Sequence, residues 1–593
     1  MGKRGTQGIA WALGLLAPVL LLAMPARAYD PAPVRGAHAM VVSAQRLASD
    51  VGIDVLRQGG NAVDAAVAVG YALAVVYPAA GNRGGGGFMT VRLVDGTAGF
   101  LDFREKAPLA ATAGMFLDET GAVVPGRSTE SWLAVGVPGS VAGLEAARVR
   151  WGRLGRAAVM EPAIRLAREG YVLGPGDVPL FAVAAKGLAR DAAAAAIFLP
   201  GGAVPRPGDR LVQADLARTL GLLMRDGPDA FYRGPLGEAL VAASVAGGGV
   251  LAMADLERYA VREMAPVSCP YRGYEILSAP PPSSGGTALC EMLGILEGYD
   301  LAAMGFRSAA AVHVIVEAMR QAFMDRNNRL GDPAFVSNPV SELLDPAYAA
   351  AVRSRILPER ATPSVLGLGP GPVRGEGSNT THYSVVDSDG MAVAVTYTLN
   401  EWFGVRKVVP GTGIVLNNEM DDFTAQPGKP NMFGLVQGEA NAVAPGKTPL
   451  SSMAPTIVVR DGRVAMVLGS PGGPRIITTV LNLVLNLVDY GMTVQEAVDA
   501  PRIHHQGLPD RVVVERFALS PDTRALLEGR GYMVVEGAPW GIAEAILVGA
   551  PRLGAAPAAS GAQSLTVGDA GGAGAGLFGA HDPRGGAGAA VGD

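Results

Sequence analysis

The most regular alternation of apolar and polar positions lies in the second half of the chain, around two short turns. Thr381 to Val386 predicts one strand, Asp387 to Gly390 a turn, and Met391 to Leu399 the returning strand. A second hairpin is predicted over Thr456 to Leu468, with its turn at Asp461-Gly462. These segments indicate antiparallel sheets in this half of the chain.

Helical periodicity surrounds these strands. Ser49 to Gln58 is amphipathic and is followed by Gly59-Gly60, a pair typical of a helix end. The stretch from Ala62 to Val76 is almost wholly apolar, but it is shorter than the roughly 20 residues of a membrane span. Ile476 to Asp489 is apolar on nearly every side, so it must lie between other layers. Hairpins and buried helices together predict stacked sheets covered by helices.

Both ends of the chain and one internal segment have a different character. Lys3 and Arg4 precede an apolar core and an Ala-x-Ala site ending at Ala28, which predicts a cleavable secretory signal over residues 1–28, with an uncleaved membrane anchor as the alternative. We therefore expect a periplasmic or secreted protein. Residues 358–377 are rich in Pro and Gly and indicate an exposed loop, whereas the Gly- and Ala-rich end from Gly549 has no function that its sequence reveals.

Composition narrows the classes of function. Hydrophobic residues make up 49% of the 593 residues and charged residues 17%, so the chain is globular. The formal charge of −5 and the lack of a Lys/Arg run argue against nucleic-acid binding. Cys269 and Cys290 are the two cysteines in the sequence; their pairing stays open, and by themselves they cannot form a four-ligand zinc site. No motif implies a metal or an organic cofactor.

The junction between the Pro/Gly-rich loop and the first hairpin carries the clearest chemical signal. A threonine hydroxyl becomes a nucleophile when a base removes its proton, and an N-terminal α-amine can be that base. Cleavage of the bond between Asn379 and Thr380 would create this amine beside the hydroxyl. Taken alone, two threonines at the start of a strand indicate only β-propensity.

Several longer motifs of the sequence resemble those of a known protein family. They are Thr380-Thr-His-Tyr-Ser-Val-Val-Asp387, Thr396-Tyr-Thr-Leu-Asn400, Leu416-Asn-Asn-Glu-Met-Asp-Asp-Phe423, Pro449-Leu-Ser-Ser-Met453 and Gly469-Ser-Pro-Gly-Gly473, with Gly59-Gly-Asn-Ala-Val-Asp-Ala-Ala66, Gly81-Asn-Arg-Gly-Gly-Gly-Gly-Phe-Met89, Asp102-Phe-Arg-Glu105, Pro282-Ser-Ser-Gly-Gly286 and Gly331-Asp-Pro333 upstream. Together they closely resemble bacterial γ-glutamyltranspeptidases over nearly all of the chain. The resemblance implies an αββα Ntn-hydrolase sandwich, an α+β fold, made as a precursor that cuts itself into a large subunit (29–379) and a small subunit (380–593).

The resemblance also implies roles for single residues. Thr380 would be the nucleophile and Thr398 would orient it, while Gly472 and Gly473 would bind the oxyanion through their N–H groups. Arg104, Ser451 and Ser452 would hold the α-carboxylate of a γ-glutamyl donor. Asn400, Glu419 and Asp422 would hold its α-ammonium. The expected partners are glutathione and other γ-glutamyl compounds, together with amino acid or dipeptide acceptors, and no cofactor is implied.

Two departures and two alternatives accompany this reading. The segment 427–438 resembles a lid loop in which Phe433 replaces the usual tyrosine, so we expect looser closure, and Pro474 replaces a frequent serine. One alternative is a glutaryl-type cephalosporin acylase, which does not need to bind an α-ammonium. The other is an inactive scaffold on the same fold, which would not cut itself.

Overall fold

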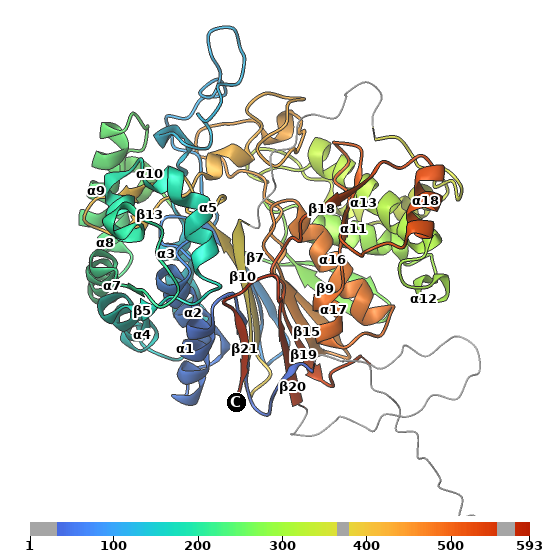
Figure 1. Ribbon diagram of the computed structural model, residues 1–593, viewed down its shortest axis with the longest axis horizontal. Helices are drawn as coiled ribbons and strands as arrows, with labels where there is room; N and C mark the ends of the chain where they lie inside the picture. The colour runs from blue at the N-terminus through green and yellow to red at the C-terminus, as the bar shows by residue number, and fades with distance from the viewer. Residues whose placement is uncertain (1–31, 365–378, 554–575) are drawn as a thin grey trace, which may run out of the picture. The chain divides into compact units, whose positions relative to one another are not determined.

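Two stacked seven-stranded sheets form the centre of the described part of the chain (Figure 1). The computed structural model describes residues 32–364, 379–553 and 576–593, so the predicted signal and most of the Pro/Gly-rich loop lie outside the described residues. In order across the first sheet, the strands are β1 (Val34–Gly36), β20 (Gly576–His581), β19 (Glu544–Gly549), β15 (Arg463–Gly469), β14 (Thr456–Arg460), β9 (Tyr274–Ser278) and β8 (Val267–Tyr271). In the second sheet they are β21 (Ala589–Gly592), β2 (Met40–Ser43), β10 (Thr380–Val386), β11 (Ala392–Thr398), β3 (Gly86–Arg92), β4 (Ala98–Asp102) and β7 (Arg262–Met264).

Both predicted hairpins are present, as β10–β11 and β14–β15, and each is antiparallel. The β10–β11 hairpin lies in the middle of its sheet, between β2 and β3. Its register pairs Thr380 with Thr398, the first residue of one strand with the last of the other. The two residues expected to act together are therefore fixed side by side by main-chain hydrogen bonding.

Apolar side chains from both sheets fill the space between them. The buried residues of this layer are Met40, Val42, Leu277, Val386, Ala392, Ala394, Ile457, Val459, Val467, Ile546 and Leu577. Alternate residues of each strand point inward, and small or branched side chains suit a layer about 10 Å thick.

Helices cover the outer face of each sheet (Figure 1). The β10-containing sheet is covered by α1 (Arg46–Arg57), α2 (Ala62–Val76), α3 (Ser140–Trp151) and α4 (Arg156–Glu169), and the other sheet by α11 (Gly285–Leu296), α13 (Ala309–Arg329), α16 (Arg475–Val488) and α17 (Val494–Asp499). This order of layers is the predicted αββα sandwich. The expected burial of α2 and α16 is confirmed, since every residue of α2 is buried.

Shorter elements complete the described chain. The remaining helices are α5 (Val178–Leu188), α6 (Ala192–Phe198), α7 (Ala214–Asp226), α8 (Asp229–Tyr232), α9 (Pro235–Ala246), α10 (Met253–Glu257), α12 (Leu301–Met304), α14 (Val340–Leu343), α15 (Pro346–Arg353) and α18 (Pro521–Gly529). The remaining strands are β5 (Tyr171–Val172), β6 (Arg210–Leu211), β12 (Val408–Val409), β13 (Ile414–Val415), β16 (Ile503–His504), β17 (Val512–Glu515) and β18 (Val534–Gly537).

Polar caps fix where two of the helices begin. α1 starts earlier than the sequence pattern predicts, because the side chain of Gln45 accepts a hydrogen bond from the Leu47 N–H. Asn61 and Asp64 form a capping box at the start of α2. Asp387, in the turn of the β10–β11 hairpin, accepts a hydrogen bond from the Ala62 N–H at 2.8 Å. The polar Asp64 in an apolar stretch is thus explained, and the hairpin is tied to the helix beneath it.

Cys269 on β8 and Cys290 on α11 form a disulfide, which answers the question that the sequence left open. Their Cα atoms are 5.8 Å apart, within the usual range for such a bond. The bond fastens α11 to the edge of its sheet. Over the described ranges, no helix is both long enough and apolar enough to span a membrane.

Candidate active site

The hydroxyl groups of Thr380 and Thr398 meet at the buried end of the β10–β11 hairpin. Their Oγ1 atoms are 3.1 Å apart, and the side chains are 5% and 2% exposed. The Thr398 hydroxyl donates to the main-chain carbonyl of Asn379 at 3.3 Å and accepts from the Asn400 N–H at 2.8 Å. One hydroxyl supplies one proton, so with Thr398 donating to Asn379, Thr380 donates to Thr398. The proton of the Thr380 hydroxyl is thereby directed away from the carbonyl carbon of Asn379.

Gly472 and Gly473 lie between the end of β15 and the start of α16. Their φ angles are +136° and +55°, in the region that favours glycine, and a Cβ on Gly473 would lie 3.0 Å from the Phe433 ring. Within the described ranges, neither N–H group has a hydrogen-bond partner. They stand at the positive end of the α16 dipole, where a negative oxygen is stabilised.

Arg104 is the centre of a buried charge cluster that includes Glu419 and Asp422. Its Nη1 donates to Glu419 at 2.6 Å, its Nη2 to Asp422 at 2.5 Å, and its Nε to the Pro449 carbonyl at 2.9 Å. Burial opposes the charge of Arg104, but the two carboxylates outweigh burial and raise its pKa above the ordinary value. The residues expected to bind opposite ends of a donor therefore bind one another in the structure.

The other three predicted binding residues surround this cluster. Asn400 has a positive φ of +73° and donates from its side chain to the Asn418 carbonyl at 2.9 Å. The Ser451 hydroxyl accepts from the Met453 N–H at 3.0 Å, and the Ser452 hydroxyl accepts from Arg326 at 3.2 Å. The fold thus holds both serine side chains in place.

A small cavity brings these residues together. It is lined by Arg104, Thr380, Thr398, Asn400, Glu419, Asp422, Phe433, Leu435, Ser451, Ser452, Met453, Gly473, Pro474 and Ile476. All the predicted site residues except Gly472 are among them. The cavity volume is about 20 Å³, enough for roughly one water molecule. A glutamyl group therefore fits only after the lining residues move apart.

The segment 427–438 lies against this cavity through Phe433, which is 4% exposed. The Gln506 side chain donates to the Phe433 carbonyl at 3.2 Å, and the Asn431 side chain accepts from the N–H groups of Phe433 and Leu435. Arg326 donates to Gln437 at 2.8 Å. Looser closure stays a prediction, but main-chain and side-chain hydrogen bonds hold the segment here without a tyrosine hydroxyl.

Sequence patterns missed two charged residues of the site. Arg326 is 1% exposed and bridges Ser452 to Gln437; burial lowers its pKa to about 10. Glu105 is fully buried, and neither of its carboxyl oxygens has a partner among the described residues. Burial raises the pKa of Glu105 to about 8 and that of Glu419 well above its usual range. Glu105 occurs in the motif Asp102-Phe-Arg-Glu105, but nothing in the spacing of that motif distinguishes it from an acidic residue on the protein surface.

A histidine close to Thr380 on β10, and the acidic and sulfur-containing side chains of the described residues, bear on other kinds of chemistry at this site. His382 is buried between the hydroxyls of Thr396 and Ser384, and burial lowers its pKa to about 3, so it is neutral. In the described ranges, no group of three or more His, Cys, Asp or Glu side chains is arranged to hold a metal ion.

Comparison with known proteins places these features in a family. A family model described as Gamma-glutamyltranspeptidase matches residues 48–566. The chain is 54% identical over 580 residues to a glutathione hydrolase proenzyme of Pseudomonas sp. (strain A14), covering 98% of each chain. It is 48% identical over 519 residues to the protein of the same name from Escherichia coli (strain K12), covering 87% of this chain and 89% of that one. A solved cephalosporin acylase from Bacillus halodurans has a TM-score of 0.80 at 27% identity, covering 98% of this chain and 99% of that one.

Proposed function

This chain belongs to the γ-glutamyltranspeptidase family, and we propose that it is a self-cleaving glutathione hydrolase with Thr380 as its nucleophile. One observation carries the proposal. The Thr380 hydroxyl is 3.1 Å from that of Thr398, which also contacts the Asn379 carbonyl, in a cavity lined by an arginine and acidic residues. Self-cleavage and γ-glutamyl transfer both use this arrangement.

Self-cleavage begins with attack of the Thr380 Oγ on the carbonyl carbon of Asn379. Thr398 receives the hydroxyl proton and, through its own hydrogen bond, polarises the carbonyl. The C–N bond then breaks, and the nitrogen of Thr380 takes up a proton and leaves as an amine. Water hydrolyses the resulting ester, which gives the carboxylate of Asn379 and frees both the hydroxyl and the α-amine of Thr380.

The same hydroxyl then attacks the γ-carbonyl of a donor, with the new α-amine as base. The N–H groups of Gly472 and Gly473 would stabilise the oxyanion, since they have no partner among the described residues. The donor's amine leaves with a proton and a γ-glutamyl ester of Thr380 remains. Water resolves the ester to glutamate, and an amino acid or dipeptide resolves it by transfer.

When a donor binds, its charged groups would replace some of the ion-pair partners within the cluster of Arg104, Glu419 and Asp422. The α-carboxylate of the donor would take the place of an acid on Arg104, assisted by Ser451 and Ser452. The α-ammonium would bind Glu419, Asp422 and Asn400. Burial raises the pKa of Glu105 and of Glu419, so an entering ammonium would offset the cost of ionising these buried carboxyl groups. The cavity of about 20 Å³ must enlarge for this exchange.

The predicted subunits 29–379 and 380–593 would remain associated after cleavage. β9 and β1 come from the first segment and pair with β14 and β20 of the second, while β10 pairs with β2 and β11 with β3. Separation would break main-chain pairing in both sheets and expose the core between them. Export through the signal at 1–28, and a periplasmic or secreted location, are part of the same proposal.

The acylase alternative shares the fold but differs in the donor it must bind. A glutaryl group has no α-ammonium, so it gives Glu419, Asp422 and Asn400 no charge to bind. Burying these acids beside one arginine is costly unless a cation uses them. Their position at the cavity favours a γ-glutamyl donor.

The test compares purified wild-type protein with Thr380→Ala by denaturing electrophoresis, N-terminal sequencing and glutamate release from glutathione. Cleavage at the predicted bond divides the 60.6 kDa chain into mature fragments of about 36 and 22 kDa, the smaller beginning Thr-Thr-His-Tyr. The variant should stay uncut and release no glutamate. A single uncut wild-type band would contradict the proposal and favour the inactive scaffold.

A further inference from the structure

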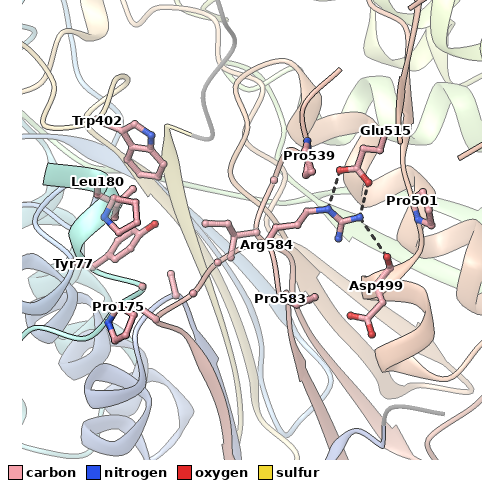
Figure 2. A pocket seen from close by; sticks show the side chains of 18 of the residues that line it. Tyr77, Pro175, Leu180, Trp402, Asp499, Pro501, Glu515, Pro539, Pro583 and Arg584 are labelled. Atoms are coloured by element: carbon pink, nitrogen blue, oxygen red, sulfur yellow. Dashed lines mark hydrogen bonds and ion pairs between the residues drawn. The ribbon is translucent and has the colours of Figure 1, made fainter. Parts of the chain in front are cut away.

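A second and much larger cavity opens beside the sandwich, and the donor cluster does not use it (Figure 2). Its volume is about 980 Å³, within the range of small-molecule sites, whereas the cavity at Thr380 has about 20 Å³. Tyr77, Leu180 and Trp402 form one wall, and Pro501 and Pro539 lie on the other (Figure 2). We call this cavity the proline groove.

The proline groove lies at the same end of the sheets as Thr380. Ala44 lines it and directly follows β2, whose Ser43 is paired with Tyr383, three residues from the nucleophile. Gly541 also lines it, and a Cβ on Gly541 would be 2.8 Å from the hydroxyl of Ser470, two residues before Gly472. Since a strand advances about 3.3 Å per residue, the groove starts within a few residue lengths of the reacting ester.

An aromatic pair of the groove lies close in sequence to a residue of the donor site. The rings of Tyr77 and Trp402 meet edge to face with centroids 6.0 Å apart. Trp402 is two residues after Asn400, which lines the small cavity. Leu180 and Pro179 of α5 continue the apolar surface outward. A group leaving or approaching Thr380 on this side therefore meets an apolar wall.

Three of the four charged residues that line the groove have side-chain partners within the protein. Arg584 donates to Glu515 at 2.8 and 2.5 Å and to Asp582 at 3.0 Å. The side chain of Asp499 accepts from Gln495 at 2.8 Å. Arg516 differs, because it is exposed, its guanidinium lies 4.8 Å from the ring centroid of the 81% exposed Phe517, and it forms no ion pair with a described residue. The groove thus combines an apolar wall with one exposed cation that has no ion-pair partner among the described residues, and with Asp499, whose hydrogen bond to a neutral amide leaves its charge in place.

We propose that the proline groove is the subsite for the acceptor, and that it selects α-amino acids and short peptides with a bulky apolar side chain. The side chain would lie on the Tyr77–Trp402 wall and Leu180, and the carboxylate would bind Arg516. This inference rests on the proposed function. In the transfer step, the acceptor's amine nitrogen bonds to the ester carbon, the bond to the Thr380 Oγ breaks, and the proton lost by the amine returns to that oxygen.

The experiment uses the self-cleaved enzyme with L-glutamine as donor, because its leaving group, ammonia, is too small to fill the groove. Phenylalanine and glycine compete as acceptors in one mixture, and chromatography gives the ratio of the two γ-glutamyl products. This ratio is independent of the amount of active enzyme and of the rate of ester formation. The wild type should favour phenylalanine by about tenfold or more, as partial burial of an aromatic ring implies.

Two variants and two controls test the walls separately. Leu180→Asp should reduce the phenylalanine preference by about tenfold, whereas Val183→Asp, on the same helix but 71% exposed and outside the groove, should leave it unchanged. Arg516→Gln should lower transfer to phenylalanine relative to phenylalanine amide by roughly threefold or more, as loss of a carboxylate contact implies. Arg463→Gln, at the exposed β14–β15 turn, is its control.

The outcomes separate the two proposals. If wild type, Leu180→Asp and Arg516→Gln all hydrolyse glutamine but give the same product ratios, the groove is not the acceptor subsite. The proposed function would still stand. A wild-type protein that forms neither glutamate nor transfer product would overturn the proposed function, and the subsite with it.

Discussion

Replacement of Thr398 by valine removes one hydroxyl from the centre of the self-cleavage geometry and keeps the shape of the side chain. In the structure this oxygen accepts from the Asn400 N–H at 2.8 Å, lies 3.1 Å from the Thr380 hydroxyl and donates to the Asn379 carbonyl at 3.3 Å. Valine can make none of these contacts. The variant therefore loses both the acceptor for the nucleophile's proton and the group that polarises the carbonyl.

Two magnitudes follow from those contacts. Loss of a hydrogen-bond donor to a developing oxyanion lowers a rate by about 10²- to 10³-fold. The Asn400 N–H, in a residue 4% exposed, loses its partner, which costs about 1–3 kcal/mol of folding free energy. Thr398→Ser keeps the hydroxyl and loses one buried methyl group, so its self-cleavage should stay within about tenfold of wild type.

The assay follows the conversion of purified precursor into the two fragments over hours to days by denaturing electrophoresis. A thermal unfolding curve, measured on each variant combined with Thr380→Ala, compares uncut proteins and separates misfolding from slow chemistry. If Thr398→Val folds cooperatively and cuts itself at the wild-type rate, the assignment of the Thr398 hydroxyl to the self-cleavage step is wrong.

Three further predictions concern the disulfide, a buried ion pair and the donor site. The bond between Cys269 and Cys290 closes a loop with a separation of 21 residues, so its replacement by two serines should lower the free energy of unfolding by about 3 kcal/mol in chemical denaturation. Burial opposes the charge of His581, but Glu544 at 2.9 Å outweighs it and raises the pKa of His581 to about 9. Because this folded-state pKa is above the unfolded one, the stabilisation is lost as the pH rises through 9; burial also raises the pKa of Glu544 to about 7, so the carboxylate partner is lost below that pH. The unfolding free-energy difference between wild type and His581→Gln should shrink by about 2–3 kcal/mol between about pH 7 and pH 10, and a constant difference would contradict this. Arg104→Lys replaces a forked donor by a point charge, so KM for glutathione should rise by about tenfold or more with less change in kcat, and an unchanged KM would exclude Arg104 from carboxylate binding.

Local patterns predicted those parts of the fold that depend on near neighbours. The β10–β11 and β14–β15 hairpins, the buried α2 and α16, and sheets covered by helices followed from alternation, turns and all-round apolarity, whereas the αββα order of layers came from the family resemblance. Helix ends were less accurate, because the cap that Gln45 provides starts α1 at Arg46, three residues before the predicted start at Ser49. The family and its enzyme class, predicted from the motifs, are confirmed by the comparisons.

The residues of the candidate site also fall into those that the sequence could predict and those that it could not. Thr380 and Thr398 were predictable as partners, because a hairpin register places the ends of its two strands opposite each other. Arg326 and Glu105 were not, because their significance comes from burial among groups far away in the sequence. Burial changes the cost of a charge, and sequence spacing does not reveal burial.

The sequence by itself determined the two hairpins, several of the helices and the family to which the chain belongs, and it places Thr380, the proposed nucleophile, at the start of a strand. Those properties depend on residues a few positions apart, or on motifs that can be compared directly. Only the tertiary structure decided that Arg104 pairs with Glu419 and Asp422, that Cys269 and Cys290 are bonded, and that a groove of about 980 Å³ opens near Thr380. Each of these depends on how distant segments pack in three dimensions, because electrostatic contacts and cavities belong to the packed chain rather than to its local pattern.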